Sequence, residues 1–265
     1  MAQRRFKRPY RAKKRKPLIF KAPFWFTILL ISAFAGGISF ACFSPWLQVT
    51  DIKISGAQTI GDKNIASTIE ASAKKQLVFL PSKSILLFNL GQAKQELLKQ
   101  FPEAADIQIK RQFPSTIYAA VMERSPIAAV DVGDGSFYII DDTGVFFKKS
   151  PDNSGLFEIN AGFGGPELKT GAVAVAKDLL QKILRTKVSI ENNAGVKLAQ
   201  AAIKNGERID FTTAEGWQIF VNPQGDLDWQ VSKLAAVAAD PAFIAQRKTL
   251  DYVDLRFTRV YVKQK

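Results

Sequence analysis

The chain has 265 residues, a formal net charge of +13 and no histidine. The absence of histidine excludes Ser-His-Asp triads and removes the commonest metal ligand. The single cysteine, Cys42, excludes an intrachain disulfide and a thiolate metal cluster. Ten of the 37 Lys and Arg residues lie in residues 1–21, which contain no Asp or Glu. The remaining 27 basic residues nearly balance the 24 acidic ones, so the body of the protein is close to neutral.

Residues 1–23 are predicted to form a basic tail, with the run RRFKRPYRAKKRK and three prolines but no apolar periodicity. This composition is typical of a segment without a packed core. One interpretation is nucleic-acid binding, in which Phe6 and Tyr10 stack on bases. We favour contact with anionic lipid and a role in membrane topology, because the following apolar segment would hold the tail beside a bilayer. No specific nucleic-acid partner is expected.

Residues 24–43 read FWFTILLISAFAGGISFACF and contain no charged residue. At about 1.5 Å per residue, a helix of this length crosses a hydrocarbon core roughly 30 Å thick. Trp25 and Trp46 flank the segment, and aromatic side chains prefer the membrane interfaces. The positive tail predicts a cytoplasmic N-terminus, so everything after about residue 45 is expected outside the cytoplasm.

Three other interpretations compete with a membrane-spanning helix. A cleaved signal peptide has a similar charge pattern, but its apolar region is typically only ~7–15 residues long. Ser39-Phe40-Ala41-Cys42 weakly resembles a lipoprotein box, although Phe40 is bulky where a small residue is usual. The flanking charges disfavour a buried core helix.

Ala33, Gly37 and Ala41 repeat at i+4, which either makes a close-packing face for another helix or reflects the frequency of small residues in membrane helices.

Residues 46–124 are predicted to form a first extracytoplasmic module in the order strand–helix–helix–strand–strand. Alternating apolar residues predict the strands, and apolar residues at helical spacing predict the helices. A loop is expected after the first helix, through Pro81. The predicted elements are Val49–Ile54, Lys63–Ala73, Leu90–Gln100, Ile107–Ile109 and Thr116–Glu123. One sheet with two helices on a face buries a small core.

Residues 125–265 are predicted to form a larger α+β module. Asp240-Pro241 is expected to end its second helix. Asp141 and Asp142 are adjacent carboxylates, but Asp-Asp-Thr-Gly is typical of a hairpin turn. The Gly-rich residues 161–166 lack the strand–GxxxxGK–helix context of a phosphate loop. The predicted strands are Ile127–Val130, Phe137–Ile140, Val145–Lys148, Lys197–Lys204, Arg208–Thr212 and Trp217–Val221, and the predicted helices are Glu167–Leu184 and Leu227–Ala239.

Near its C-terminus the chain reads LDYVDLRFTRVYVK, Leu250–Lys263, which is rich in β-branched and aromatic residues. Val253, Leu255 and Phe257 alternate with polar residues, and then the apolar positions shift parity at Thr258-Arg259. Two interpretations stay open. Thr258-Arg259 is either the turn of a hairpin, although it lacks the preferred Gly or Asn, or a β-bulge in one continuous strand.

Three stretches, VTDIKISGAQTI, FPEAADIQIKRQFPSTIYAAVMERSPIAAV and YIIDDTGVFFK, resemble the FtsQ/DivIB family of cell division proteins. So do GWQIFVNPQGDLDWQVSKLAAV and the LDYVDLRFTRVYVK stretch. The likeness covers about residues 20–265, with the tail, helix and modules in the same order. It implies an α+β fold: one N-terminal transmembrane helix, a POTRA domain over residues 46–124, and a β domain over residues 125–265 that ends in an edge strand.

The resemblance implies a non-enzymatic scaffold in the cell membrane, at the division septum. Its implied partners are FtsB- or DivIC-type and FtsL-type coiled-coil division proteins and, through them, the septal wall synthase. In the family, the last strand accepts a partner strand by β-augmentation. The residues alone also allow a simpler role, in which the stretch closes the sheet and its basic side chains protect the edge. Carried onto this sequence, the partner-binding residues are Arg256, Phe257, Arg259, Val260, Tyr261, Val262 and Lys263.

Three other functions fit the sequence less well. A POTRA-containing chaperone, or a membrane-anchored peptide-binding module not specific to division, is one; the chaperone predicts tandem POTRA repeats or a β-barrel, and the sequence shows neither. A hydrolase without histidine needs a Ser-Lys or carboxylate pair, and no such motif stands out. DNA binding by the tail would be nonspecific. We therefore expect no catalytic residue, cofactor or metal ion.

Overall fold

The computed structural model describes residues 22–73, 75–77, 80–162, 168–204 and 206–265. Most of the predicted basic tail and of the Gly-rich residues 161–166 lies outside these ranges. The chain divides into two compact units: the first comprises Met1–Lys53, Ala66–Ala93 and Ile109–Ala119, and the second comprises Ile54–Ile65, Lys94–Gln108 and Ala120–Lys265. These units cut across the predicted domain limits, which stay predictions.

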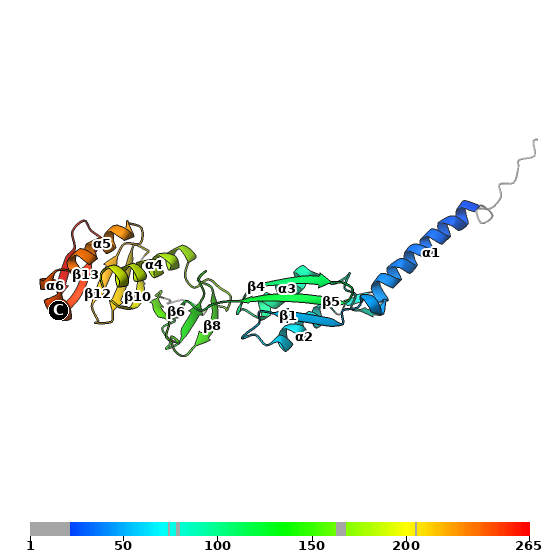
Figure 1. Cartoon of the computed structure of the whole chain (residues 1–265), viewed down its shortest axis with the longest axis horizontal. Coiled ribbons are helices and arrows are strands. Elements are labelled where there is room, and N and C mark those ends of the chain that lie inside the picture. The colour runs from blue at the N-terminus through cyan, green and yellow to red at the C-terminus, as the bar shows by residue number, and fades with distance from the viewer. Residues whose placement is uncertain (1–21, 74, 78–79, 163–167, 205) are drawn as a thin grey trace, which may run out of the picture. The chain divides into compact units, whose positions relative to one another are not determined.

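The first helix, α1 (Ala22–Phe43), is continuous and apolar (Figure 1). By length and composition alone, Pro23–Phe43 is the one helix in the described part of the chain that could cross a membrane. Its side chains are exposed over nearly the whole length, which suits lipid rather than water. Ala33 and Gly37 are exposed and Ala41 is half-buried. The use of this small-residue face stays a prediction.

The end of α1 is tied to a loop of the same compact unit. The Ser84 hydroxyl donates to the Ala41 carbonyl at 2.7 Å. The Gln48 side chain makes a second link: its amide nitrogen donates to the Cys42 carbonyl at 3.0 Å, and its oxygen accepts the Lys83 N–H at 2.7 Å. Because three hydrogen bonds hold helix and loop together, this end of α1 is a fixed junction and not a free linker.

A small sheet follows α1. The elements of this region are η2 (Pro45–Leu47), β1 (Asp51–Ser55), α2 (Asp62–Ala73), β2 (Lys75–Leu77), β3 (Leu80–Ser82), α3 (Leu90–Gln100), β4 (Ala104–Gln112) and β5 (Thr116–Glu123). The sheet has the order β1-β5-β4, and the predicted order of strands and helices is confirmed. The loop predicted through Pro81 is wrong, because β2 and β3 pair there as a hairpin. Ile65 and Ile69, at i and i+4 of α2, are fully buried as their spacing predicts.

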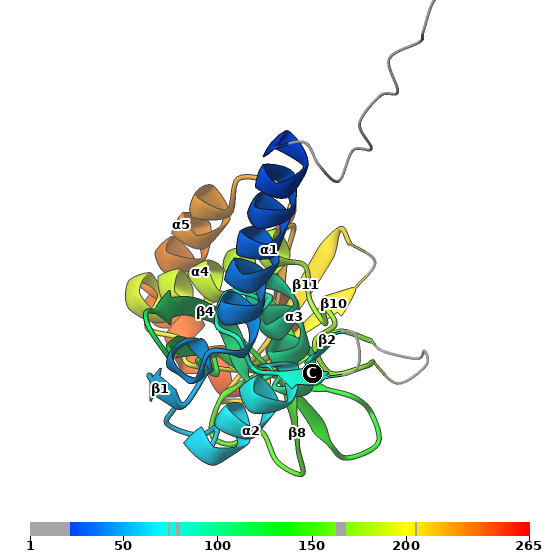
Figure 2. The same cartoon turned by 90° about the vertical axis from the view of Figure 1, so that its right-hand side faces the viewer.

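A second, larger sheet lies in the second compact unit. Its elements are β6 (Ala128–Asp131), β7 (Phe137–Ile140), β8 (Phe146–Ser150), β9 (Phe157–Asn160), α4 (Lys177–Asn193), β10 (Leu198–Lys204), β11 (Arg208–Thr213), β12 (Gln218–Val221), α5 (Leu227–Ala238), α6 (Pro241–Gln246), η3 (Arg247–Thr249), β13 (Leu250–Asp254) and β14 (Tyr261–Gln264). The nine strands have the order β14-β13-β12-β11-β10-β9-β6-β7-β8. α4 and α5 lie side by side (Figures 1 and 2), and their apolar faces share one core with the sheet.

The helix predicted over Glu167–Leu184 is wrong at both ends, since α4 runs from Lys177 to Asn193. The helix α4 begins only at Lys177, and residues before it make backbone hydrogen bonds near the start of β8. The Phe146 N–H donates to the Ala172 carbonyl at 2.9 Å. Gly171 has a φ of +91°, which lies outside the helical range. The apolar residues before Lys177 therefore keep helical spacing although the backbone there is not helical.

The remaining predicted elements of this unit are confirmed to within a few residues, but β9 and α6 were not predicted. Asp240 ends α5 as expected. Its carboxylate also accepts the Ala242 N–H at 2.9 Å and so caps the start of α6. One Asp-Pro pair therefore serves as the stop of one helix and the start of the next.

Glu123 and its neighbour Arg124, at the end of β5, join separate stretches of the second compact unit. The Glu123 carboxylate accepts the N–H groups of Gln58, Thr59 and Ile60 at 2.8–2.9 Å. Burial alone would raise the pKa of Glu123, but these backbone donors outweigh it and hold the pKa below its ordinary value. The carboxylate is thus held in its charged form by the turn that it organises.

The Arg124 guanidinium completes this junction, which we call the Glu123–Arg124 junction. It donates to the Pro102 carbonyl at 3.0 Å and forms a largely buried ion pair with Asp141. Asp141 also accepts the N–H groups of Thr143 at 2.9 Å and Val145 at 3.0 Å, so the predicted hairpin turn is confirmed. Burial would raise the pKa of Asp141, but these hydrogen bonds and Arg124 hold it below its ordinary value.

Candidate functional site

The parity shift near the C-terminus is the turn of a hairpin. β13 and β14 pair antiparallel, with Val253 opposite Val262 and Asp254 opposite Tyr261. Residues 255–260 connect the two strands. The interpretation as a turn is confirmed, and a bulge in one continuous strand is wrong. Because the connection is longer than two residues, it does not need the Gly or Asn that a two-residue hairpin prefers.

β14 is an edge strand of the nine-stranded sheet. Among the described residues it pairs only with β13, so the N–H and C=O groups on its outer side point away from the sheet. All residues of β14 are exposed. Such an edge can accept another strand through backbone hydrogen bonds, while alternate side chains select which strand binds.

The predicted binding residues share one hairpin but not one strand. They fall in three places: Arg256, Phe257 and Arg259 in the turn, Val260 just before β14, and Tyr261, Val262 and Lys263 within β14. The alternation of Val253, Leu255 and Phe257 predicts a strand that runs to Phe257, and this is wrong, since β13 ends at Asp254. The Asp254 carboxylate accepts the Arg256 N–H at 3.1 Å, which turns the chain locally.

The turn is held by its own side chains and by α5. Arg256 donates from Nε and Nη2 to the two Asp254 oxygens at 2.9 and 2.6 Å. This bidentate hydrogen bonding raises the pKa of Arg256 against the opposing effect of burial. Lys233 of α5 donates to the Leu255 carbonyl at 2.7 Å and also to the Phe257 carbonyl. The turn is therefore ordered without any partner.

Lys233 is the residue of this site that sequence reasoning missed. Burial lowers the pKa of its ammonium group, and the Asp254 carboxylate opposes that change. The Lys233 Nζ also lies 3.8 Å from the centroid of the Trp229 ring. The one sequence signal is Lys233-Leu234, which lies within GWQIFVNPQGDLDWQVSKLAAV, one of the stretches that carry the family resemblance. From α5, the long lysine side chain reaches the backbone carbonyls of the turn between β13 and β14.

Charged and aromatic side chains line the sheet face opposite the α4–α5 core. Asp210, Phe220, Asp254 and Tyr261 are successive cross-strand neighbours from β11 to β14. The Arg208 guanidinium pairs with Asp210 at 2.7 Å and lies 4.5 Å from the centroid of the Phe220 ring. Cross-strand pairs of this kind stabilise a sheet laterally. They connect β14 to the neighbouring strands of the sheet.

The Phe257 side chain, which belongs to the turn, packs against Tyr261 on this face of the sheet. Its ring meets the Tyr261 ring edge to face, with centroids 5.7 Å apart. Together with Tyr252 and Asp254, these rings line a hollow of about 260 Å³. The hollow lies directly beside β14, so a side chain of an added strand can enter it.

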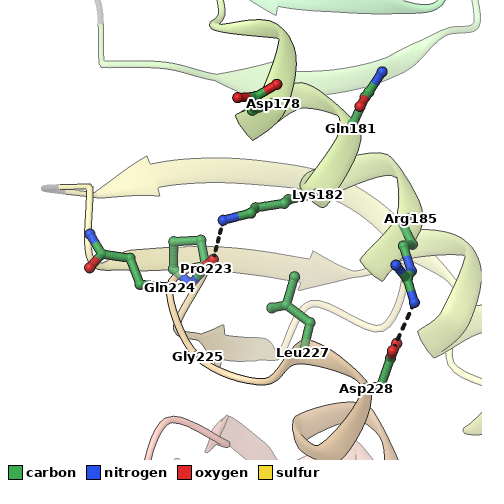
Figure 3. Close-up of a pocket in the computed structure, with 9 residues that line it drawn as sticks. All are labelled: Asp178, Gln181, Lys182, Arg185, Pro223, Gln224, Gly225, Leu227 and Asp228. Carbon is green, nitrogen blue, oxygen red and sulfur yellow. Dashed lines mark hydrogen bonds and ion pairs between the residues drawn. The ribbon is translucent and has the colours of Figure 1, made fainter.

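A second hollow, of about 520 Å³, lies between α4 and the start of α5 (Figure 3). Lys182 donates to the Pro223 carbonyl at 2.9 Å, and Arg185 pairs with Asp228 at 2.7 Å. Both members of that ion pair are exposed, and exposed pairs contribute little energy. Across the described ranges, no group of three or more His, Cys, Asp or Glu residues could hold a metal ion.

Two family models match this chain. Residues 47–124 match the POTRA domain, FtsQ-type, and residues 128–256 match the C-terminal domain of cell division protein FtsQ/DivIB. The expected mixed α+β fold, with a POTRA-type domain followed by a larger sheet domain, is confirmed by these matches and by the element order.

Individual relatives are similar over much of the chain. Cell division protein FtsQ of a Geobacter species is 26% identical over 211 residues, 75% of this chain and 73% of the relative. Cell division protein DivIB of Clostridium tetani is 23% identical over 242 residues, 88% of this chain and 83% of the relative. Cell division protein FtsQ of Streptomyces bingchenggensis is 26% identical over 157 residues. That match covers 56% of each chain, so it spans little more than half of the Streptomyces protein.

Proposed function

Because this chain belongs to the FtsQ/DivIB family of cell division proteins, we propose that it is a non-enzymatic scaffold that binds other division proteins outside the cytoplasm. The observation that carries the proposal is the exposed edge strand β14. The proposed partners are FtsB- or DivIC-type and FtsL-type coiled-coil proteins and, through them, the septal wall synthase.

A partner segment adds to β14 as a further strand of the sheet. Tyr261 and Lys263 project to the face with the aromatic hollow, and Val262 projects to the opposite face, because side chains alternate along a strand. Arg256 and Lys233 hold the preceding turn in place before binding, which reduces the entropy lost when the partner docks. The proposed contact residues are Arg256, Phe257, Arg259, Val260, Tyr261, Val262 and Lys263.

Two neighbouring proline variants test this binding mode. In an antiparallel ladder, successive residues direct their N–H groups alternately toward the neighbouring strand and away from it. Tyr261→Pro and Val262→Pro therefore remove one inward and one outward donor. We expect the variant that loses an outward-pointing N–H to keep its unfolding transition and to lose the partner in a pull-down. The variant that loses an inward-pointing N–H should lose stability as well. Wild-type recovery of the partner by the stable variant would show that β14 is not the docking edge.

The proposal also assigns a topology. α1 crosses the cell membrane, the basic tail (residues 1–23) rests on anionic lipid of the cytoplasmic leaflet, and residues 46–124 and 125–265 form the POTRA and β domains outside. The face of Ala33, Gly37 and Ala41 is open to a partner helix. A fluorescent fusion should concentrate at the midcell septum. Uniform staining of the membrane would contradict a role in division.

A further inference from the structure

A short loop of the first compact unit, residues 83–88, is fixed beside the end of α1. The Ile85 N–H donates to the Leu47 carbonyl at 2.7 Å, and the Ser84 hydroxyl donates to the Ala41 carbonyl at 2.7 Å. Ala41 belongs to the last turn of α1. The loop is therefore held at the level of the last apolar turn of the helix, close to where the helix ends.

This loop buries two of its apolar side chains and exposes two. Ile85 and Phe88 are buried and anchor the loop, whereas Leu86 and Leu87, in the turn between them, are 44% and 37% exposed. Trp46, in the connection that follows α1, is 80% exposed. Single exposed apolar side chains are common on protein surfaces, but these three adjoin the two residues joined by the Ile85–Leu47 hydrogen bond, at one end of an apolar helix, and so we treat them as one patch.

Basic side chains border this patch. The Arg111 guanidinium donates to the Phe88 carbonyl at 2.6 Å, so its charge lies beside the loop. Lys83, at the start of the loop, is half-buried. The combination of exposed Trp and Leu with neighbouring cations is the composition that favours the boundary between phospholipid headgroups and acyl chains.

We propose that Trp46, Leu86 and Leu87 form a membrane-docking wedge, which inserts into the outer leaflet of the phospholipid bilayer crossed by α1. The inference rests on the proposed membrane topology of α1. Continuity with the helix selects lipid as the occupant: α1 stays apolar to Phe43, and a loop hydrogen-bonded to Ala41 meets the same leaflet. The wedge holds the base of the POTRA-type domain on the membrane surface.

Depth-dependent fluorescence quenching of the full chain tests the wedge. The chain, with Cys42→Ala to remove the native thiol, is reconstituted without partners in vesicles of phosphatidylethanolamine and phosphatidylglycerol. An environment-sensitive dye is attached at Leu87→Cys in the wedge, at Leu29→Cys inside α1, or at Val188→Cys on the exposed side of α4. Lipids that carry a nitroxide high on the acyl chain serve as quenchers. Circular dichroism confirms that each labelled protein keeps its fold.

The dyes at Leu87 and Leu29 should lose most of their emission to the nitroxide lipid and show blue-shifted spectra, and the dye at Val188 should do neither. If Leu29 is quenched while Leu87 behaves like Val188, the wedge is wrong and the membrane topology stands. If neither Leu29 nor Leu87 is quenched, the topology itself is wrong. If Leu87 is shielded only after an FtsL-type membrane segment is added, the patch is a protein surface and the assignment to lipid is overturned.

Discussion

Two of the Arg–Asp pairs in the second compact unit, Arg124–Asp141 and Arg256–Asp254, serve opposite purposes. Arg124 and Asp141 lie 17 positions apart, are largely buried, and also hydrogen-bond to nearby backbone groups. Arg256 and Asp254 lie two positions apart and shape a turn whose neighbouring strand is exposed. The same kind of ion pair therefore joins stretches of the chain in one place and supports an exposed edge strand in the other. We expect the first region to control stability and the second to control binding.

Breaking the closed junction should have the largest effect. Arg124→Ala removes the cation that pairs with the largely buried Asp141 carboxylate, and breaking a buried pair in this way typically costs about 3–5 kcal/mol. The free energy of unfolding of the full chain, measured by denaturant titration with circular dichroism, should fall by that amount. Arg185→Ala is the matched control, because it removes an exposed pair worth at most about 1 kcal/mol. Equal losses for both variants would contradict the comparison.

A negative charge introduced at the open edge should weaken partner binding without reducing stability. Val262→Glu places a carboxylate on β14, where Val262 is 46% exposed. Partner affinity should fall at least tenfold, or about 1.4 kcal/mol, since the added charge loses water when a strand docks. The control is Val188→Glu, the same substitution at a residue of α4 that is 53% exposed. Isothermal titration with the partner checks the result, and equal affinity for the two variants would argue against the edge.

The Glu123 side of the junction should make stability depend on pH. Its folded-state pKa lies below the ordinary value of 4.5, so the charged form stabilises the native state above that pH. This contribution is lost as the pH falls through the folded pKa. Glu123→Gln should cost about 1 kcal/mol near neutral pH and flatten the acid side of the stability curve. Unfolding transitions measured from neutral to acidic pH would show whether the slope persists in the variant.

Local patterns were enough to predict most elements of this fold. The apolar run of α1, the alternation in β5 and the Asp-Pro stop after α5 are each written in a few neighbouring residues. The start of α4 was mispredicted because apolar residues keep helical spacing through Val173, while the backbone there bonds to the start of β8. A one-dimensional pattern carries no record of which distant strand competes for those backbone groups.

The candidate site was predictable only in part for the same reason. β14 reads as a strand from its composition, and its place at the edge was suggested by family resemblance and not by periodicity. The turn after Asp254 depends on a side-chain hydrogen bond to Arg256, and Lys233 acts from 22 positions away. These contacts follow from the packing of α5 on the sheet, which only the three-dimensional fold reveals.

Gln48 gives the junction at the end of α1 a consequence for direction. Both ends of its amide are engaged, one with the helix and one with the loop, so α1 cannot roll about its own axis without turning the domain base with it. In the proposed topology, the direction in which Ala33 and Gly37 face within the bilayer therefore fixes the direction in which the adjoining domain faces outside it. If a partner helix packs on this face, as proposed, it also sets the orientation of the domain outside the membrane.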